Sequence, residues 1–133
     1  MKTAIESKFK FNNPRVVELS FKVNSAFDDS KYNGYGIQYE TRISNREAES
    51  AEVSLAVSLG VDEETVPFLL KAMVKADFKW DSSLLNDETV DSLLNRNAKV
   101  LLLSYLRPFI AHMTVDAGFS PFVLPFYDFT EEK

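Results

Sequence analysis

The single histidine and the acidic clusters are the residues of this sequence that could do chemistry. Nucleophilic catalysis by His112 would require an activated serine and an acid next to it. No motif in the sequence marks such residues. Acids gather at Asp28–Asp29, Asp62–Glu64 and Glu131–Glu132, and paired carboxylates can exchange protons or bind calcium. These acids fall in expected turns or at the end of the sequence, where solvated charge is their ordinary role. We therefore expect no catalytic residue, no metal site and no enzymatic activity.

A row of lysines is the other pattern with chemical meaning. Lys71, Lys75 and Lys79 recur at spacings that place them on one face of an expected strand, so that they could bind an anion or form a solvated face. We favour the solvated face. The four glycines form no phosphate-binding loop, so no cofactor is expected.

Length and composition indicate one domain, residues 1–133, with 45% hydrophobic and 26% charged residues. A net charge of −5 argues against nucleic acid as a partner, since an acidic surface repels phosphates. The absence of cysteine fits a reducing compartment. No apolar run resembles a signal peptide or approaches the roughly 20 residues of a membrane helix. We expect a cytoplasmic protein that does not insert into membranes.

Alternating apolar and polar residues predict four strands in the first half of the chain. They cover residues 16–24, 36–44, 51–60 and 67–80. Short polar loops join the last three strands as a meander, with residues 60–65 as the second loop. The longer link over residues 25–35 predicts a crossover, which would place the first strand beside the fourth.

Apolar residues at three- and four-residue spacing predict helices in the second half. A short helix begins at Asn86 and is expected to break at residues 95–97, and a longer one follows from Ala98 to a glycine cap at Gly118. Pro108 lies within that pattern and removes one helical hydrogen bond, so the long helix is either kinked near Ser104 or begins later. We favour the kink. The predicted fold class is α+β, a four-stranded antiparallel sheet followed by helices packed on one face.

Residues 117–129, "AGFSPFVLPFYDF", combine five aromatic rings with two prolines that prevent one regular element. The rings either close the core or serve a partner. A full set of exposed rings would promote aggregation. We expect about half of them inside and the rest shielded by a second subunit or a bound polypeptide.

The stretch from Leu101 to Phe129 resembles the end of SecB-type protein-export chaperones. There a helix carrying a tyrosine–arginine motif leads through a threonine- and glycine-containing turn into proline- and aromatic-rich residues. The matching residues here are Tyr105, Arg107, Thr114, Gly118, Phe119, Pro121, Leu124, Phe126, Tyr127, Asp128 and Phe129. Residues 14–24 are also similar to the family's first strand.

The resemblance implies a chaperone that holds unfolded polypeptides without ATP, in apolar grooves between the sheet and the C-terminal region. On this basis the client-binding residues are Tyr105, Phe109, Phe119, Phe122, Leu124, Phe126, Tyr127 and Phe129. The family forms dimers through first strands and tetramers through long helices. The expected oligomer interface therefore includes Val17, Leu19, Phe21, Leu102, Leu106 and Met113. Whether this chain also binds an export ATPase is left open.

Two alternatives share the predicted fold. The first is a dedicated chaperone or adaptor for one client, such as an antitoxin. The second is a small-ligand-binding protein that uses the concave face of the sheet, with Tyr39, Arg107 and His112 converging in the pocket.

Overall fold

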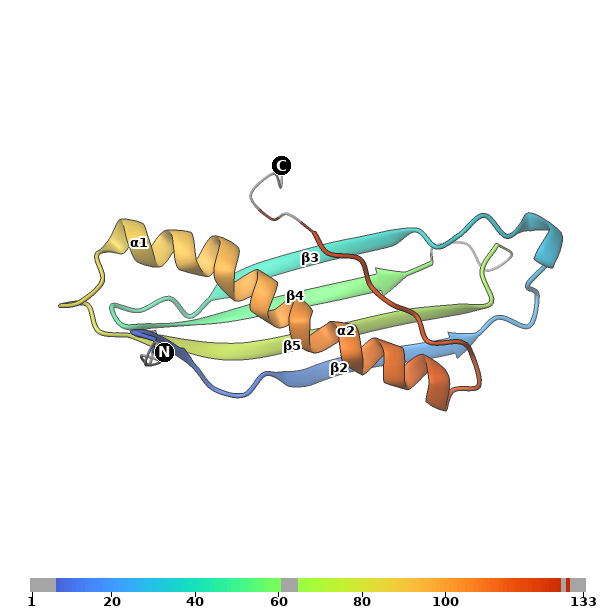
Figure 1. Cartoon of the computed structure of the whole chain (residues 1–133), viewed down its shortest axis with the longest axis horizontal. Helices are drawn as coiled ribbons and strands as arrows, with labels where there is room; N and C mark the ends of the chain where they lie inside the picture. The colour runs from blue at the N-terminus through green and yellow to red at the C-terminus, as the bar shows by residue number, and fades with distance from the viewer. Residues whose placement is uncertain (1–6, 61–64, 128, 130–133) are drawn as a thin grey trace, which may run out of the picture.

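The computed structural model describes residues 7–60, 65–127 and 129 of the chain. The elements are β1 (Phe9–Phe11), β2 (Arg15–Val23), a 3-10 turn (Asp29–Lys31), β3 (Ile37–Ser44), β4 (Ser50–Leu59), β5 (Phe68–Trp80), α1 (Asp87–Ser92), a π-helical turn (Leu93–Asn97) and α2 (Ala98–Asp116). The strands form one antiparallel sheet, and the helices lie across one of its faces (Figure 1). The predicted α+β class is confirmed.

The sheet combines a meander with one returning strand. β3, β4 and β5 pair in succession, and β2 pairs with the other side of β5, with Leu19 opposite Ala72. The link between β2 and β3 therefore crosses from one edge of the sheet to the other, as predicted. The predicted loop over residues 60–65 lies mostly outside the described residues. The same holds for the acids at 62–64 and 131–132.

The four predicted strands are confirmed, but the sheet also contains a fifth strand that the sequence pattern did not reveal, so the predicted number of strands is one too few. β1 pairs with the last residues of β5, with Phe9 opposite Trp80, and it continues the edge that β2 begins. Pro14 separates β1 from β2, because proline has no N–H for the ladder. A three-residue strand is too short to show a convincing alternation of side chains.

Alternation along β5 divides the sheet into a core face and an outer face, as predicted. The even-numbered residues from Phe68 to Trp80 are buried, whereas the odd-numbered ones from Leu69 to Lys79 are half-buried or exposed. The core face of β4 and the inner side of α2 close on these residues. The side chains that are fully buried there are Val53, Leu55, Val57, Leu59, Leu102, Leu106 and Ile110. Each such burial stabilises the fold by about 1.5–3 kcal/mol.

The predicted helix break at residues 95–97 is wrong, because a π-helical turn joins α1 to α2 (Figure 1). Val90 of α1 and Leu94 of the π-helical turn are fully buried. Their packing against the core overrides the weak helix propensity of the exposed asparagines. α2 begins at Ala98 and contains Pro108, which rules out a later start. Pro108 and Ser104 are exposed, so water can reach the carbonyl that lacks a helical partner. The kink stays a prediction.

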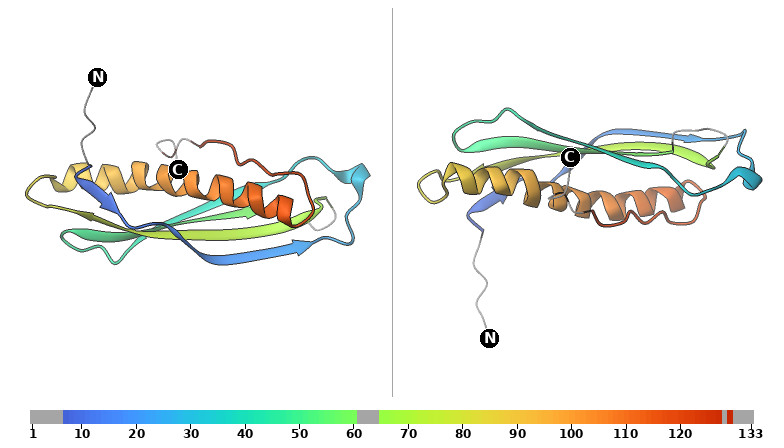
Figure 2. Two further views of the ribbon diagram at one scale, coloured as in Figure 1. Left: turned by 60° about the horizontal axis from the view of Figure 1, so that its bottom comes forward. Right: turned by 90° about the horizontal axis from the view of Figure 1, so that it is seen from above.

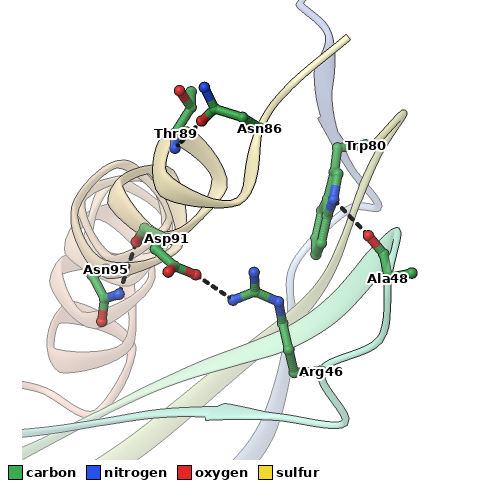
Figure 3. Close-up of polar contacts among 7 residues, drawn as sticks. All are labelled: Arg46, Ala48, Trp80, Asn86, Thr89, Asp91 and Asn95. Carbon is green, nitrogen blue, oxygen red and sulfur yellow. Dashed lines mark hydrogen bonds and ion pairs between the residues drawn. The ribbon is translucent and has the colours of Figure 1, made fainter. Parts of the chain in front are cut away.

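Polar contacts hold the start of the helices against the β3–β4 turn (Figure 3). The Arg46 guanidinium lies 2.8 Å from the Asp91 carboxylate and 5.4 Å from the centre of the Trp80 ring. The indole N–H of Trp80 donates to the Ala48 carbonyl at 3.0 Å. Asn86 caps α1 by accepting from the Thr89 amide at 2.8 Å. These contacts set where the helical layer begins on the sheet.

Replacing the helix cap should measure its contribution. Asn86→Ala is expected to lower the free energy of unfolding by about 1 kcal/mol, because it leaves the Thr89 amide without a partner. Urea denaturation followed by circular dichroism measures this change. Asn97→Ala is the matched control, since Asn97 is exposed and its side chain makes no capping hydrogen bond. Equal losses in the two variants would contradict the prediction.

Candidate functional site

The candidate site is built around the C-terminal segment, residues 117–127 and 129. Gly118 adopts φ 96°, a left-handed conformation that favours glycine, and so ends α2 as predicted. The Gly118 amide donates to the Val115 carbonyl, and the Phe119 amide donates to the Thr114 carbonyl, both at 2.9 Å. The segment then turns back along the helix side of the sheet, as Figure 2 shows.

Two side chains of α2 anchor this extended segment. The Thr114 hydroxyl, which is buried, accepts a hydrogen bond from the Phe122 amide at 2.9 Å. The Arg107 Nε donates to the Leu124 carbonyl at 2.7 Å, and its guanidinium lies 3.9 Å from the centre of the Phe126 ring. Arg107 and Thr114 are both among the residues that resemble the C-terminal motif of SecB-type chaperones. Their role as anchors of the C-terminal segment emerges only from the structure.

The aromatic side chains of the segment extend two clusters along the sheet. Phe119 lies against Phe68, with ring centres 4.9 Å apart, and Phe122 meets Tyr35 edge-on at 5.1 Å. Farther along the segment, the ring centres of Tyr127 and Tyr39 lie 4.1 Å apart. The segment is therefore attached to the sheet mainly by rings and by the two anchors.

The segment divides its side chains between the interior and solvent. Leu124 is fully buried and Phe129 nearly so, while Phe119 and Phe122 are half-buried. Phe126 is 77% exposed and Val123 is 63% exposed, and Tyr127 is also partly exposed. Leu124 and Phe129 thus serve the core in this subunit, although the sequence suggested client contacts for them. The sequence reasoning missed Val123, whose exposure follows from its place beside the buried Leu124.

Tyr105 and Phe109 lie on the other flank of α2. They stand four residues apart and so share one side of the helix. Arg107, which reaches the C-terminal segment, stands two residues from each of them, about 200° around the helix. Tyr105 is exposed, and Phe109 is half-buried against the core. The eight suggested client residues therefore occupy two surfaces separated by α2.

The residues suggested for oligomer contacts also divide into exposed and buried sets. Val17 and Leu19 are exposed on the edge strand β2, and Phe21 is half-buried against Phe68. Leu102 and Leu106 are fully buried between α2 and the sheet, so a second subunit cannot reach them in this arrangement. The apolar stripe to which Leu102 and Leu106 belong lies on the side of α2 that faces the sheet. Its outer side carries Leu101, Ser104, Tyr105, Pro108, His112 and Val115.

The three residues suggested for a small-ligand pocket do not converge. Tyr39 lies beneath the C-terminal segment, Arg107 is engaged by that segment, and His112 is exposed on α2. A hollow of about 340 Å³ lies on the outer face of the sheet, lined among others by Glu40, Arg42 and Lys75. None of Tyr39, Arg107 and His112 lines it. Among the described residues, no cluster of three histidines or acids could hold a metal ion.

Two tyrosine hydroxyls are buried beside the segment without a hydrogen-bond partner among the described residues, those of Tyr35 and Tyr39. Burial raises the pKa of Tyr35 to about 12. Burial also raises the pKa of Tyr39, and the nearby Tyr127 hydroxyl adds to this effect.

A family model described as preprotein translocase subunit SecB matches residues 3–131. The chain belongs to the SecB family. The resemblance of residues 101–129 is thereby confirmed. Proteins of this family are chaperones rather than enzymes. No curated protein matches this SecB family member. In the ranges 7–60 and 65–127, no helix has the length and apolar character needed to cross a membrane.

One solved structure supports the same fold. The SecB-like chaperone Rv1957 of Mycobacterium tuberculosis, in complex with a ChAD peptide from the Rv1956 HigA1 antitoxin, aligns with a TM-score of 0.70. The identity is 14%, and the alignment covers 91% of each chain. A Streptococcus agalactiae protein of unknown function aligns with a TM-score of 0.47 at 12% identity, over 93% of this chain and 100% of that one. Family membership and fold together support a chaperone role.

The Tyr35 hydroxyl should make stability depend on alkaline pH. The unfolded chain ionises this group near the ordinary pKa of 10.0, whereas burial raises the folded pKa to about 12. The contribution of this hydroxyl to stability should therefore be constant below pH 10 and fall between pH 10 and pH 12. Tyr35→Phe should keep the ring contacts and reduce this fall, as measured by urea unfolding at neutral and alkaline pH. Tyr105→Phe, at an exposed tyrosine on α2, should leave the fall unchanged. An identical alkaline loss in Tyr35→Phe and the parent protein would refute the assignment.

Proposed function

We propose that this SecB family member is a cytoplasmic chaperone that holds unfolded polypeptides without ATP. The observation that carries the proposal is the exposure of Phe126 and Val123 on a segment that is otherwise anchored to the subunit. An anchored apolar side chain offers contact area without the full entropic cost of ordering it on binding. Family membership and the shared fold agree with this role.

The proposed mechanism is passive capture by two apolar surfaces beside α2. The first consists of Val123, Phe126 and Tyr127, and the second of Tyr105 and Phe109. Apolar burial has no preferred direction, so many client sequences can bind to such surfaces. The half-buried Phe119 and Phe122 lie at the base of the C-terminal segment and extend the apolar area. A net charge of −5 would help to keep the complex soluble.

We propose that oligomers form through the edge strand β2. Leu19 is 46% exposed and Val23 is 55% exposed on the side of the sheet that bears the helices, because α2 packs on β4 and β5. Val17 adds to this edge. An apolar edge strand with unpaired backbone groups tends to pair with another strand. A second contact through the outer side of α2 would involve Leu101 and Tyr105 rather than the buried Leu102 and Leu106.

A dedicated chaperone for one client is the second candidate function. The Mycobacterium tuberculosis chaperone of the same fold was solved with a peptide from an antitoxin. A survey of chemically unfolded proteins separates the two candidates. Suppression of light scattering for several unrelated proteins supports a general holding chaperone, and suppression for one alone supports the dedicated form.

Removing the exposed apolar side chains should weaken the holding activity. The double variant Val123→Ser and Phe126→Ser is expected to bind unfolded protein about a hundredfold more weakly, since each buried apolar side chain contributes at least about 1.5 kcal/mol and about 1.4 kcal/mol corresponds to a tenfold change in affinity. Light scattering of a chemically unfolded protein at varied chaperone concentration measures this. Tyr32→Ser, at another exposed ring, is the control and should retain activity. Full activity in the double variant, with urea unfolding unchanged, would refute the proposed surface.

Charges placed on the edge strand should dissociate the oligomer. The double variant Leu19→Lys and Val23→Lys is expected to reduce the native mass to that of one chain, because it sets like charges across the strand pair. Light scattering after size exclusion gives the mass. Leu84→Lys, at an exposed leucine outside the sheet, should keep the parent oligomer. An oligomer that survives both edge lysines would exclude β2 as the interface.

A further inference from the structure

The link between β2 and β3 contains the only asparagine of the sequence that is followed by glycine, Asn33 with Gly34. The side-chain amide of an asparagine can be attacked by the backbone nitrogen of the next residue, which closes a five-membered ring. Glycine in that next position leaves the nitrogen accessible, because glycine has no side chain. The pair lies outside every helix and strand, in the link that stands at one end of the sheet (Figure 1).

The structure leaves both reacting groups unrestrained. Asn33 and Gly34 are exposed, and within residues 7–60 and 65–127 no hydrogen bond engages the Asn33 side chain or the Gly34 amide. Gly34 adopts φ 82°, and a Cβ placed on it would meet no heavy atom beyond its chain neighbours within 4 Å. The pair can therefore reach the ring-closing geometry without opening a helix or a strand.

Asn24, at the start of the same link, is the contrasting case. Serine, which is also small, follows it in the sequence. Asn24 is buried, its side-chain nitrogen donates to the Val66 carbonyl at 3.0 Å, and its side-chain oxygen accepts from the Ala26 amide at 3.0 Å. These contacts must break before a ring can close. The fold therefore protects Asn24 and leaves Asn33 unprotected.

We propose that Asn33 is a site of spontaneous deamidation in the folded protein. The Gly34 nitrogen forms a bond to Asn33 Cγ and gives up its proton, the bond from Cγ to Nδ2 breaks, and Nδ2 leaves with that proton as ammonia. Water then opens the ring at either carbonyl and yields aspartate or isoaspartate at position 33. Water is the one co-reactant, and nothing is oxidised or reduced. The site is independent of the proposed holding activity.

The product changes the link beside its aromatic residues. Deamidation adds one negative charge, and isoaspartate also adds one carbon to the main chain between Tyr32 and Tyr35. The Tyr35 ring is held, since its centre lies 5.0 Å from that of Phe68 and 5.1 Å from that of Phe122. Tyr32 is 51% exposed and has room to move. We therefore expect isoaspartate to loosen the 3-10 turn (Asp29–Lys31) that precedes Tyr32.

Incubation of the protein at mildly alkaline pH tests the site. Rising pH accelerates the reaction, because the attacking nitrogen must lose its proton. Peptide mapping by mass spectrometry follows each asparagine in buffer and in urea at the same pH. Folding should change the rate at Asn33 by less than about threefold and slow the rate at Asn24 by at least about tenfold. Strong protection of Asn33 by folding, or equal protection at both positions, would overturn the proposal.

Matched glycine variants test the mechanism. Gly34→Ser places a side chain beside the attacking nitrogen and should slow deamidation of Asn33 severalfold or more. Gly36→Ser makes the same exchange two residues farther on and should leave the rate unchanged. Circular dichroism checks that Gly34→Ser folds, because serine is strained at φ 82°. Equal rates in the two variants would refute attack by the Gly34 nitrogen.

A comparison of products tests the effect on the link. Anion exchange separates the deamidated fraction, which contains isoaspartate, from the parent protein. Asn33→Asp carries the added charge without the added carbon. Hydrogen exchange over residues 25–32 should be faster in the deamidated fraction than in Asn33→Asp or the parent protein. Equal exchange in all three would refute the loosening of the turn.

Discussion

The core face of β5 is the constraint on which the rest of the structure depends. This strand pairs with β4 on one side and with β2 and β1 on the other, and its buried side chains run from Phe68 to Trp80. α2 can bury its own apolar side only by lying over β5 and β4. Because one helix covers about two strands, β2 keeps exposed apolar side chains at its edge. The surfaces proposed for partners therefore follow from how the core is closed.

The C-terminal segment shows how anchoring produces exposure. Thr114 holds the Phe122 amide and Arg107 holds the Leu124 carbonyl, so that Leu124 is directed into the core. In an extended chain neighbouring side chains point in different directions, and Val123 is consequently turned to solvent. Phe126 lies on the Arg107 guanidinium rather than in the interior. The same arginine thus buries one apolar residue of the segment and presents another.

The residues of the candidate site could be predicted only in part. The concentration of rings in residues 117–129 indicated a functional surface, and the structure leaves Phe126 and Tyr127 exposed. The sequence could not show that Leu124 and Phe129 are taken by the core, because that depends on the Arg107 and Thr114 anchors. Tyr105 and Phe109 looked continuous with the segment in sequence, yet helix geometry places them on the opposite flank of α2. Leu102 and Leu106, predicted as oligomer contacts, are buried within the subunit, since an apolar helix stripe marks the side that faces the core.

The sequence by itself determined the fold class, the four longer strands, the crossover to the far edge and the membership suggested by residues 101–129. Side-chain periodicity and turn chemistry are local properties, so they can be read without knowing what packs on what. Only the tertiary structure decided that β1 joins the sheet, that a π-helical turn joins the two helices and that the lysines of β1 and β5 face each other. Those outcomes depend on burial of Leu94 and on pairing between segments far apart in the chain, which no local pattern encodes.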